Sequence, residues 1–271
     1  MQPHVSIFEA LVLGVVQGIT EFLPISSDGH LAITAMLFGT HDMPLAFVVM
    51  LHAGTLLATL IMFRKDVAEL LTAVFHALRA PKQALGTDDG RMVLSIIAGT
   101  IPTGIVGLLL EEPVEAWSSI KWIVGLCLFA SGLALVVTLY ARSTDVKVFG
   151  FRHSVLVGIA QGMAVLPGLS RSGSTIALAM VFGMAGPQAF RYSFLLSLPA
   201  VGGAVLLKAL RHGALSGLGV QAAIGAVVSF FVGMGALYAL RAAVSRGKLW
   251  IFAAYLIPLG VGVMIWGAMS P

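Results

Sequence analysis

The chain has 271 residues, of which 58% are hydrophobic and only 10% are charged. A soluble domain of this length carries about a quarter charged residues, and one this apolar would expose large adhesive patches. The composition therefore excludes an ordinary soluble globular protein and favours a chain whose solvent is lipid. The net charge of +4 is carried by short segments between apolar runs, so it does not indicate nucleic-acid binding.

Two segments near the starts of the two halves of the chain, 5–39 and 153–186, contain helical runs too short to span a membrane. Each has an apolar helix, a polar break rich in Gly, Pro and Ser, and a second short apolar helix. Broken helices of this kind dip into the membrane and return, where protein or water covers the break. We therefore expect two re-entrant hairpins.

Six other apolar runs are long enough to cross a bilayer, which takes about 20 mainly apolar residues. In chain order these are Leu45–Phe63, Val93–Leu110, Trp122–Tyr140, Tyr192–Leu207, Leu218–Leu240 and Leu249–Gly267. Prolines 102, 199 and 258 lie inside these runs, and we expect them to kink the helices rather than end them. The fold class predicted is an all-α polytopic membrane protein with six full transmembrane helices and the two hairpins.

The two hairpin segments resemble each other. With a shift of 144, residues 14–39 (GVVQGITEFLPISSDGHLAITAMLFG) align without gaps with residues 158–183 (GIAQGMAVLPGLSRSGSTIALAMVFG), and nine of 26 positions are identical. Chance similarity between two Gly-rich apolar segments is the alternative. Each half is one hairpin plus three spans, and because three is odd, the second half is inverted relative to the first. The sequence thus predicts one membrane domain, 1–271, made of inverted repeats 1–140 and 153–271.

The distribution of basic residues predicts the orientation. Twelve Lys and Arg residues fall on one predicted side of the membrane and three on the other. Basic loops stay in the cytoplasm. We therefore expect the twelve-charge side to be cytoplasmic and both termini to lie outside.

Five ionisable residues lie at membrane depth, where a charge costs about 2.5–3.5 kcal/mol on insertion scales. They are Glu21, Asp28, His30, His52 and Arg171. Such residues are functional or paired, and four of the five lie in the two breaks. His52 either lines a site or bonds to a neighbouring helix, and the sequence does not choose between these.

The first break supplies an acid, a hydroxyl and an imidazole. Gln17 and Glu21 are four residues apart, so they share a helix face and could hold a hard divalent cation with phosphate oxygens and water. The alternative is that Glu21 caps a helix or pairs with Arg171. Ser27 and His30 are close enough along the chain to meet across a turn, as an activated nucleophile requires. A purely structural His30 is the alternative there.

The second break resembles an anion cradle. Hydroxyl residues and glycine precede an apolar helix and leave backbone N–H groups free, while Arg171 adds a fork for two phosphate oxygens. The Walker pattern is absent, and a purely salt-bridging Arg171 is the alternative. The predicted phosphate-binding residues are Ser26, Ser170, Arg171, Ser172, Gly173 and Thr175. Facing the first break, this loop favours a phosphorylated amphiphile as substrate.

At these residues the chain resembles a known family. The segments 17–21 (QGITE), 24–30 (PISSDGH) and 167–175 (PGLSRSGST) are similar to the signature motifs of the bacterial undecaprenyl pyrophosphate phosphatases, also called bacitracin-resistance phosphatases. The resemblance runs essentially end to end. It implies hydrolysis of undecaprenyl pyrophosphate to undecaprenyl phosphate and inorganic phosphate, with Mg²⁺ or Ca²⁺ as cofactor. It also implies recycling of the carrier lipid for cell-wall synthesis in the bacterial plasma (inner) membrane, at a site open to the outer face.

The family's functional residues map onto these motifs. Glu21 matches the acidic residue, and Gln17 stands where many members have a second Glu, which lowers the charge available to a metal. Ser27 and His30 match the hydroxyl and imidazole, and Ser170, Arg171 and Thr175 match the phosphate loop.

We expect direct phosphoryl transfer with Glu21, Ser27, His30 and Arg171 as catalytic residues. In this mechanism Ser27, activated by His30, attacks the terminal phosphorus, or His30 activates water instead. The rival is a transporter or flippase for a phosphorylated polyprenyl lipid, because inverted repeats with broken helices are also transporter architecture. Membrane lipid and the polyprenyl pyrophosphate are the expected partners, and a homodimer is left open.

Overall fold

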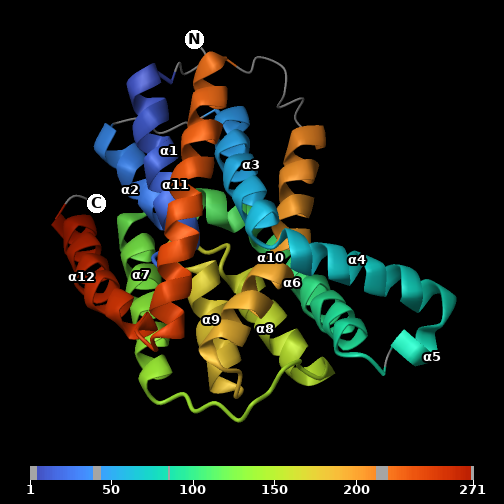
Figure 1. Cartoon of the computed structure of the whole chain (residues 1–271). Helices are drawn as coiled ribbons and strands as arrows, with labels where there is room; N and C mark the ends of the chain where they lie inside the picture. The colour runs from blue at the N-terminus through green and yellow to red at the C-terminus, as the bar shows by residue number, and fades with distance from the viewer. Residues whose placement is uncertain (1–4, 39–43, 85, 212–218, 270–271) are drawn as a thin grey trace.

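The fold is described from a computed structural model for residues 5–38, 44–84, 86–211 and 219–269 (Figure 1). This part of the chain contains helices and no strand. The helices are α1 (Ile7–Phe22), α2 (Ser27–Phe38), α3 (Leu45–Met62), α4 (Arg64–Arg79), α5 (Pro81–Ala84), α6 (Asp88–Ser118), α7 (Lys121–Val136), η1 (Val137–Leu139), α8 (Phe151–Met163), α9 (Arg171–Val181), α10 (Gly186–Arg211), α11 (Val220–Ser245), η2 (Leu249–Phe252) and α12 (Ala253–Met269).

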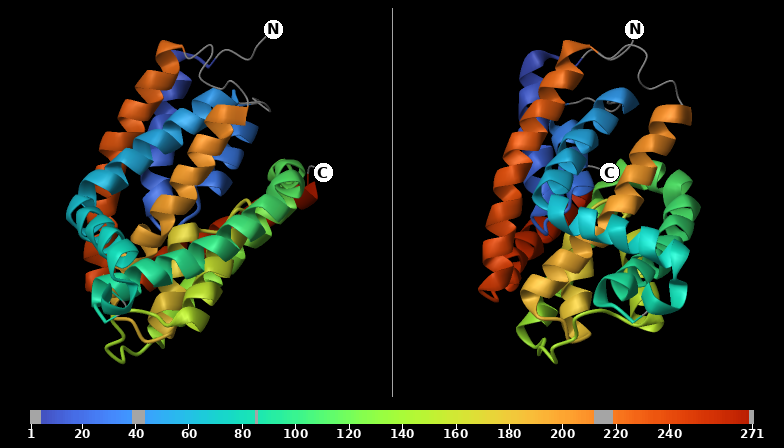
Figure 2. Two further views of the ribbon diagram at one scale, coloured as in Figure 1. Left: turned by 90° about the vertical axis from the view of Figure 1, so that its right-hand side faces the viewer. Right: turned by 45° about the vertical axis from the view of Figure 1, so that its right-hand side comes forward.

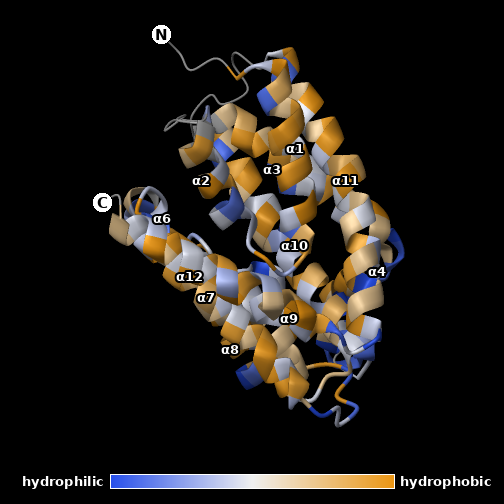
Figure 3. Ribbon diagram, turned by 90° about the vertical axis from the view of Figure 1, so that its left-hand side faces the viewer, coloured by the Kyte–Doolittle hydropathy of each residue, from blue (hydrophilic) through white to orange (hydrophobic). Residues whose placement is uncertain are grey.

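Five of the six predicted spans are confirmed as helices long and apolar enough to cross a membrane, so the chain is a multi-pass membrane protein. They are Asp88–Val114, Lys121–Leu139, Gly186–Leu210, Val220–Ser245 and Leu249–Met269. Residues 218–219 were predicted to open the fifth run; Leu218 lies outside the described residues. Pro102, Pro199 and Pro258 lie within α6, α10 and α12, so they do not end these helices, as expected; the kinks stay a prediction. Hydrophobic residues make up much of these helices (Figure 3), and many of their large apolar residues are exposed.

The first predicted span, Leu45–Phe63, is confirmed only in part. α3 ends at Met62, and α3 and α4 reach the length of a span only as a pair bent by 79°. The bend comes where the sequence turns from apolar to charged. Arg191 on α10 forms an ion pair with Asp66 on α4 and lies 3.6 Å from Glu69, so α4 is held against the bundle after the bend.

The two hairpins are α1–α2 and α8–α9. In Figure 1 α1 descends and α8 rises, so their broken ends come together in the middle of the molecule. The first helix of each hairpin packs along a helix of the other half: α1 lies along α11, and α8 lies along α6. Figure 2 shows the same arrangement from two other sides. Packing of each first helix against the other half is expected of two inverted repeats. The repeat boundaries 1–140 and 153–271 stay a prediction.

Small residues allow these helices to approach closely, as is common in membrane bundles. A Cβ on Gly18 would lie 2.9 Å from the backbone of Ser229 and Gly233 on α11. In the other half, a Cβ on Gly158 would lie 2.1 Å from the carbonyl oxygen of Gly99 on α6. Glycine is therefore required at both helix crossings.

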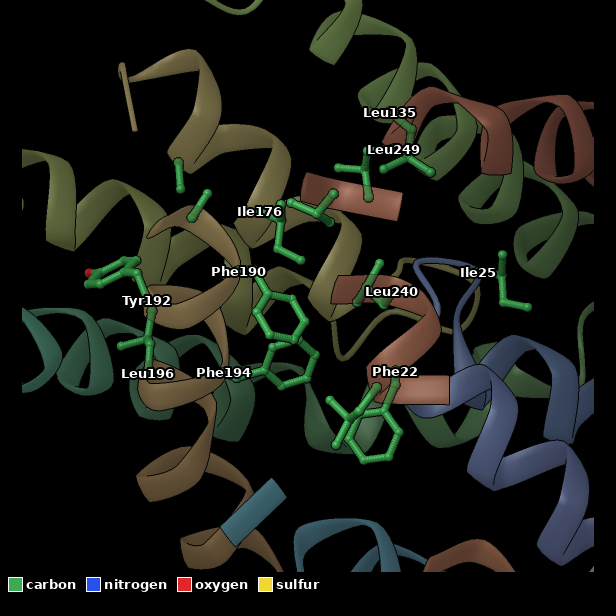
Figure 4. Close-up of a cluster of buried hydrophobic side chains, with 14 of the residues drawn as sticks. Phe22, Ile25, Leu135, Ile176, Phe190, Tyr192, Phe194, Leu196, Leu240 and Leu249 are labelled. Atoms are coloured by element: carbon green, nitrogen blue, oxygen red, sulfur yellow. The ribbon is translucent and has the colours of Figure 1, made fainter. Parts of the chain in front are cut away.

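An aromatic cluster lies under the meeting point of the hairpins (Figure 4). Phe22, the last residue of α1, packs on Phe194 of α10 with ring centroids 5.9 Å apart. Phe194 in turn contacts Phe63 and Phe190 at 5.7 and 4.8 Å. Burying these rings anchors the end of α1 against α3 and α10.

Replacing Gly158 by alanine should lower the stability of the protein. The new methyl group would overlap the Gly99 carbonyl and push α8 from α6, and overpacking of this kind costs about 1–3 kcal/mol. The measurement is the thermal unfolding midpoint of the purified protein in detergent. Gly104→Ala is the matched control, because Gly104 lies on α6, the helix against which Gly158 packs, and a Cβ there meets no atom within 4 Å. Equal midpoints for the two variants would contradict the packing argument.

Candidate active site

The tips of the two hairpins interlock. A Cβ on Gly29 would lie 2.9 Å from the Cα of Gly168, and one on Gly173 would lie 3.1 Å from the Cβ of Pro24. The two contacts are equivalent in the repeat, because the shift of 144 residues aligns Gly29 with Gly173 and Pro24 with Gly168. The Ser172 hydroxyl also donates to the Phe22 carbonyl at 3.0 Å. The tips therefore form one continuous structure.

Glu21 lies at the centre of this structure, in the last turn of α1. Its side chain is only 5% exposed, and its Oε1 forms an ion pair with Nη2 of Arg171, the first residue of α9. A buried carboxylate needs such a partner, because desolvating one charge alone costs several kcal/mol. Of the alternatives open from the sequence, pairing of Glu21 with Arg171 is thus observed.

The other oxygen of Glu21, Oε2, accepts two hydrogen bonds. The Ser27 hydroxyl donates to it at 2.7 Å, and the Gln17 amide nitrogen donates at 3.0 Å. His52 Nε2 lies 3.9 Å from the same oxygen. One carboxylate therefore gathers the predicted guanidinium, hydroxyl and amide from both halves of the chain.

The expected contact between Ser27 and His30 is not formed. His30 Nδ1 lies 2.8 Å from the Ser26 carbonyl oxygen, and His30 Nε2 lies 2.8 Å from the Tyr255 hydroxyl. A carbonyl only accepts, so Nδ1 carries the hydrogen and the Tyr255 hydroxyl donates to Nε2 of the neutral ring. The pairing was wrong because the two residues leave the first turn of α2 in different directions, Ser27 toward α1 and His30 toward α12.

Ser26 and Ser170 begin the second helix of each hairpin in the same way. The Ser26 hydroxyl accepts from the Gly29 amide at 3.3 Å, and the Ser170 hydroxyl accepts from the Gly173 amide at 3.1 Å. Ser26 has a φ of 72°, an uncommon conformation for a residue with a side chain. Both serines are buried, so in this structure their hydroxyls stabilise the helix starts.

The remaining residues of the predicted phosphate loop also have protein partners. Thr175 donates to the Arg171 carbonyl at 2.8 Å and contacts the Ser193 hydroxyl on α10. Ser170 N–H donates to the Ser131 hydroxyl on α7 at 2.8 Å, and that hydroxyl donates to the Gly168 carbonyl at 3.1 Å. The loop is therefore fixed from α7 and α10. Phosphate binding by these residues stays a prediction.

His52 lines the site, which was one of its two predicted positions. Its Nδ1 lies 3.0 Å from the Val48 carbonyl of its own helix, so Nε2 faces the site. That nitrogen is 4.0 Å from Asp28 Oδ1 as well as 3.9 Å from Glu21. From the sequence, Asp28 was expected at membrane depth but was assigned no role. Its position between Ser27 and His30 could have indicated that it belongs to the site. Tyr255 carried no signal, because 225 residues separate it from His30.

The donor set near Glu21 is sparse for a metal ion. Among the described residues no group of three or more His, Cys, Asp or Glu side chains is arranged to hold a cation. Within the same part of the chain, the buried Gln17 Oε1 has no hydrogen-bond partner. Mg²⁺ is usually held by one or two carboxylates together with substrate phosphates. A cation held by Gln17 and Glu21 stays a prediction, and it would need oxygens supplied by such a substrate.

Comparisons with known proteins agree with these motifs. The family model described as bacitracin resistance protein BacA matches residues 10–262. The chain is 40% identical over 270 residues to the undecaprenyl-diphosphatase of Desulfosudis oleivorans, covering 96% of this chain and 98% of that one. It is 36% identical over 264 residues to the undecaprenyl-diphosphatase of Mycolicibacterium smegmatis, covering 94% and 95%. The chain therefore belongs to the bacitracin resistance protein BacA family.

Proposed function

We propose that this chain is an integral membrane phosphatase that hydrolyses undecaprenyl pyrophosphate to undecaprenyl phosphate and inorganic phosphate. The observation that carries the proposal is the arrangement of Arg171, Glu21 and Ser27 at the meeting point of the hairpins. An anion-binding guanidinium, a carboxylate and a hydroxyl bonded to that carboxylate are the groups that phosphoryl transfer needs. The names of the relatives in the BacA family support the same reaction.

Arg171 is the residue best placed to receive the pyrophosphate. Its planar fork can pair with two phosphate oxygens, whereas at present only its Nη2 pairs with Glu21 Oε1. When the phosphate takes over this pairing, Glu21 Oε1 is released from Arg171 and can help to hold the divalent cation of the proposal. Glu21 Oε2 keeps its hydrogen bond from Ser27 and remains the atom that can take the Ser27 proton.

The chemical step follows from the bond between Ser27 and Glu21. As the Ser27 oxygen bonds to the terminal phosphorus, its proton passes to Glu21 Oε2, and the bond from that phosphorus to the bridging oxygen breaks. Undecaprenyl phosphate leaves, and water then releases inorganic phosphate from the serine. In the alternative, Glu21 takes a proton from water, which attacks directly. His30 would serve as the base only after its Nε2 releases Tyr255. Most of the rate enhancement comes from positioning and electrostatics.

A divalent cation, Mg²⁺ or Ca²⁺, is part of the proposal. Glu21, Asp28 and Gln17 would hold it together with phosphate oxygens. When bound, it would neutralise charge that develops on the phosphate during transfer.

The proposal places the chain in the bacterial plasma membrane, where it recycles the carrier lipid of cell-wall synthesis. The excess of basic residues on one side supports a cytoplasmic location for that side, with both termini outside and the site open to the outer face. All the polar groups of the site come from one chain, so a homodimer is not required for the chemistry.

The second candidate function is transport of a phosphorylated polyprenyl lipid. The observation that favours it is the pair of hairpins entering from opposite ends, an arrangement shared with transporters. A transporter needs binding but has no use for a hydroxyl held on a buried carboxylate. Phosphate release from a C55 isoprenyl pyrophosphate by the detergent-purified protein separates the two functions. Lipid flux in vesicles without phosphate release would favour the transporter.

Replacing Glu21 by glutamine or Arg171 by alanine should reduce phosphate release at least about a hundredfold, the size of effect seen when one group that stabilises a transition state is removed. The measurement is kcat/KM for a C55 isoprenyl pyrophosphate. Arg191→Ala is the matched control, because it also removes an Arg–carboxylate ion pair, with Asp66, but outside the site. Gel filtration and thermal unfolding establish that each variant is folded. Near-normal release by both site variants would reject the assignment.

Ser27 can be tested as the nucleophile by trapping. Rapid acid quenching of the protein with a ³²P-labelled pyrophosphate substrate should leave label on Ser27, since phosphoserine is stable to acid. The Ser27→Ala variant should keep no label and lose most of its activity. An active Ser27→Ala variant would show that water attacks directly and that the hydroxyl only positions Glu21.

The cation concentration that phosphate release requires should depend on the number of carboxylates at the site. EDTA should abolish phosphate release, and added Mg²⁺ or Ca²⁺ should restore it. Gln17→Glu adds a third carboxylate to Glu21 and Asp28, so the half-saturating cation concentration should fall by about tenfold, which corresponds to about 1.4 kcal/mol. Full activity in EDTA would exclude the cation from the proposal.

A further inference from the structure

A shallow groove of about 510 Å³ runs along one face of α12. Its lining repeats every three or four residues, as one helix face does, and includes Tyr255, Pro258, Leu259, Gly262, Val263 and Trp266. From residue 254 to residue 266 the groove extends for about 18 Å along the helix, at a rise of 1.5 Å per residue. All these side chains except the Tyr255 hydroxyl and the indole nitrogen are apolar.

One end of this groove belongs to the catalytic region. Tyr255 lines the groove, and its hydroxyl bonds to His30 Nε2 at 2.8 Å. The Tyr255 and His30 rings are stacked, with centroids 5.7 Å apart and planes inclined by 20°. His30 is bonded through Nδ1 to Ser26, the residue before Ser27. A molecule that filled the groove would therefore end next to Tyr255, two hydrogen bonds from the carbonyl of Ser26, the residue before the proposed nucleophile.

The opposite face of α12 explains why the groove remains open. That face packs on α7 through close small-residue contacts: a Cβ on Gly260 would lie 2.6 Å from the amide nitrogen of Phe129. On the groove side, a Cβ on Gly262 meets no atom within 4 Å. The helix is thus fixed by one face, and glycine and proline leave a hollow on the other.

We propose that the groove along α12 binds the isoprenyl chain of the substrate, over the part next to the pyrophosphate, with Tyr255 as the wall between chain and head group. This inference rests on the proposed function, because it takes the substrate to be a polyprenyl pyrophosphate. Two features distinguish the groove from the lipid-exposed helix faces: it is hollow, and it is continuous with His30 through Tyr255. A hollow lined with apolar and aromatic side chains binds a chain of the same character.

Filling the groove should weaken binding of long-chain substrates. Gly262→Phe places a ring in the hollow without an internal clash, so KM for a C55 isoprenyl pyrophosphate should rise about tenfold or more while kcat changes little, the effect of losing a few apolar contacts. KM for inorganic pyrophosphate, which has no chain, should not change. The matched control is Gly235→Phe on α11, where a Cβ also meets no atom within 4 Å. An equal KM for the two variants would overturn the proposal.

Removing the Tyr255 hydroxyl should change kcat rather than KM, unlike filling the groove. Tyr255→Phe keeps the ring that lines the groove but removes the hydrogen bond that orients His30. Because His30 Nδ1 in turn holds the Ser26 carbonyl next to Ser27, kcat should fall while KM for the C55 substrate is retained. Tyr238→Phe, on the exposed surface of α11, is the control. A change in KM alone would show that the hydroxyl does not connect the groove with the catalytic residues.

A third experiment uses the unaltered protein and does not need hydrolysis. An isoprenyl pyrophosphate with a diazirine in its chain should label α12 between residues 254 and 266 on illumination, and excess undecaprenyl phosphate should prevent the labelling. Labelling of α12 that competitor does not prevent would identify an ordinary membrane-lipid site, and labelling elsewhere would also overturn the proposal. Cross-linking reports binding and does not depend on hydrolysis. An error in the location of the groove would appear as labelling elsewhere, whereas an error in the proposed function would appear as no phosphate release by the wild-type chain.

Discussion

The ion pair between Glu21 and Arg171 is the interaction on which the arrangement of this protein depends. Each residue lies at the end of a helix too short to cross a membrane, and each would be costly in lipid without its partner. Pairing them requires that two hairpins enter from opposite ends and stop where they meet. The interlocked glycines, the Phe22 anchor and the hydroxyl bonds from Ser172 and Ser131 all serve to keep that meeting point in place.

The two hairpins share a framework and differ in chemistry. Both begin their second helix with a serine cap on a glycine amide, at Ser26–Gly29 and Ser170–Gly173. Both also carry a buried glutamine, Gln17 or Gln161, whose amide oxygen has no partner among the described residues. Four residues after that glutamine, however, one copy has Glu21 and the other has Val165. A symmetric framework thus holds an asymmetric site, which an ion pair requires because its two members must carry opposite charge.

Much of this could be predicted from the sequence because membranes impose simple rules. Apolar length identified five spans, and the cost of buried charge identified Glu21 and Arg171 as residues with partners. The sequence could not supply the directions in which the side chains point. Ser27 and His30 are three residues apart, and spacing alone suggested that they meet, whereas the start of α2 turns one toward Glu21 and the other toward Tyr255. The sequence also left the 79° bend after Met62 open, because an amphipathic run that follows an apolar one can lie in the membrane interface or extend the same helix. Tyr255 lay beyond sequence reasoning, since its partner is set by the packing of α12.

The exchange of hairpins between the halves has a consequence for how the chain is made. α1 is synthesised first, yet it packs along α11, which is synthesised nearly last. Until α9 and α11 have entered the membrane, Glu21 has no guanidinium beside it and Gly18 faces lipid rather than a neighbouring helix. The contacts that complete the first hairpin therefore form only after most of the chain has been made. A chain that stops before Arg171 carries Glu21 without the partner that offsets the cost of burying its charge.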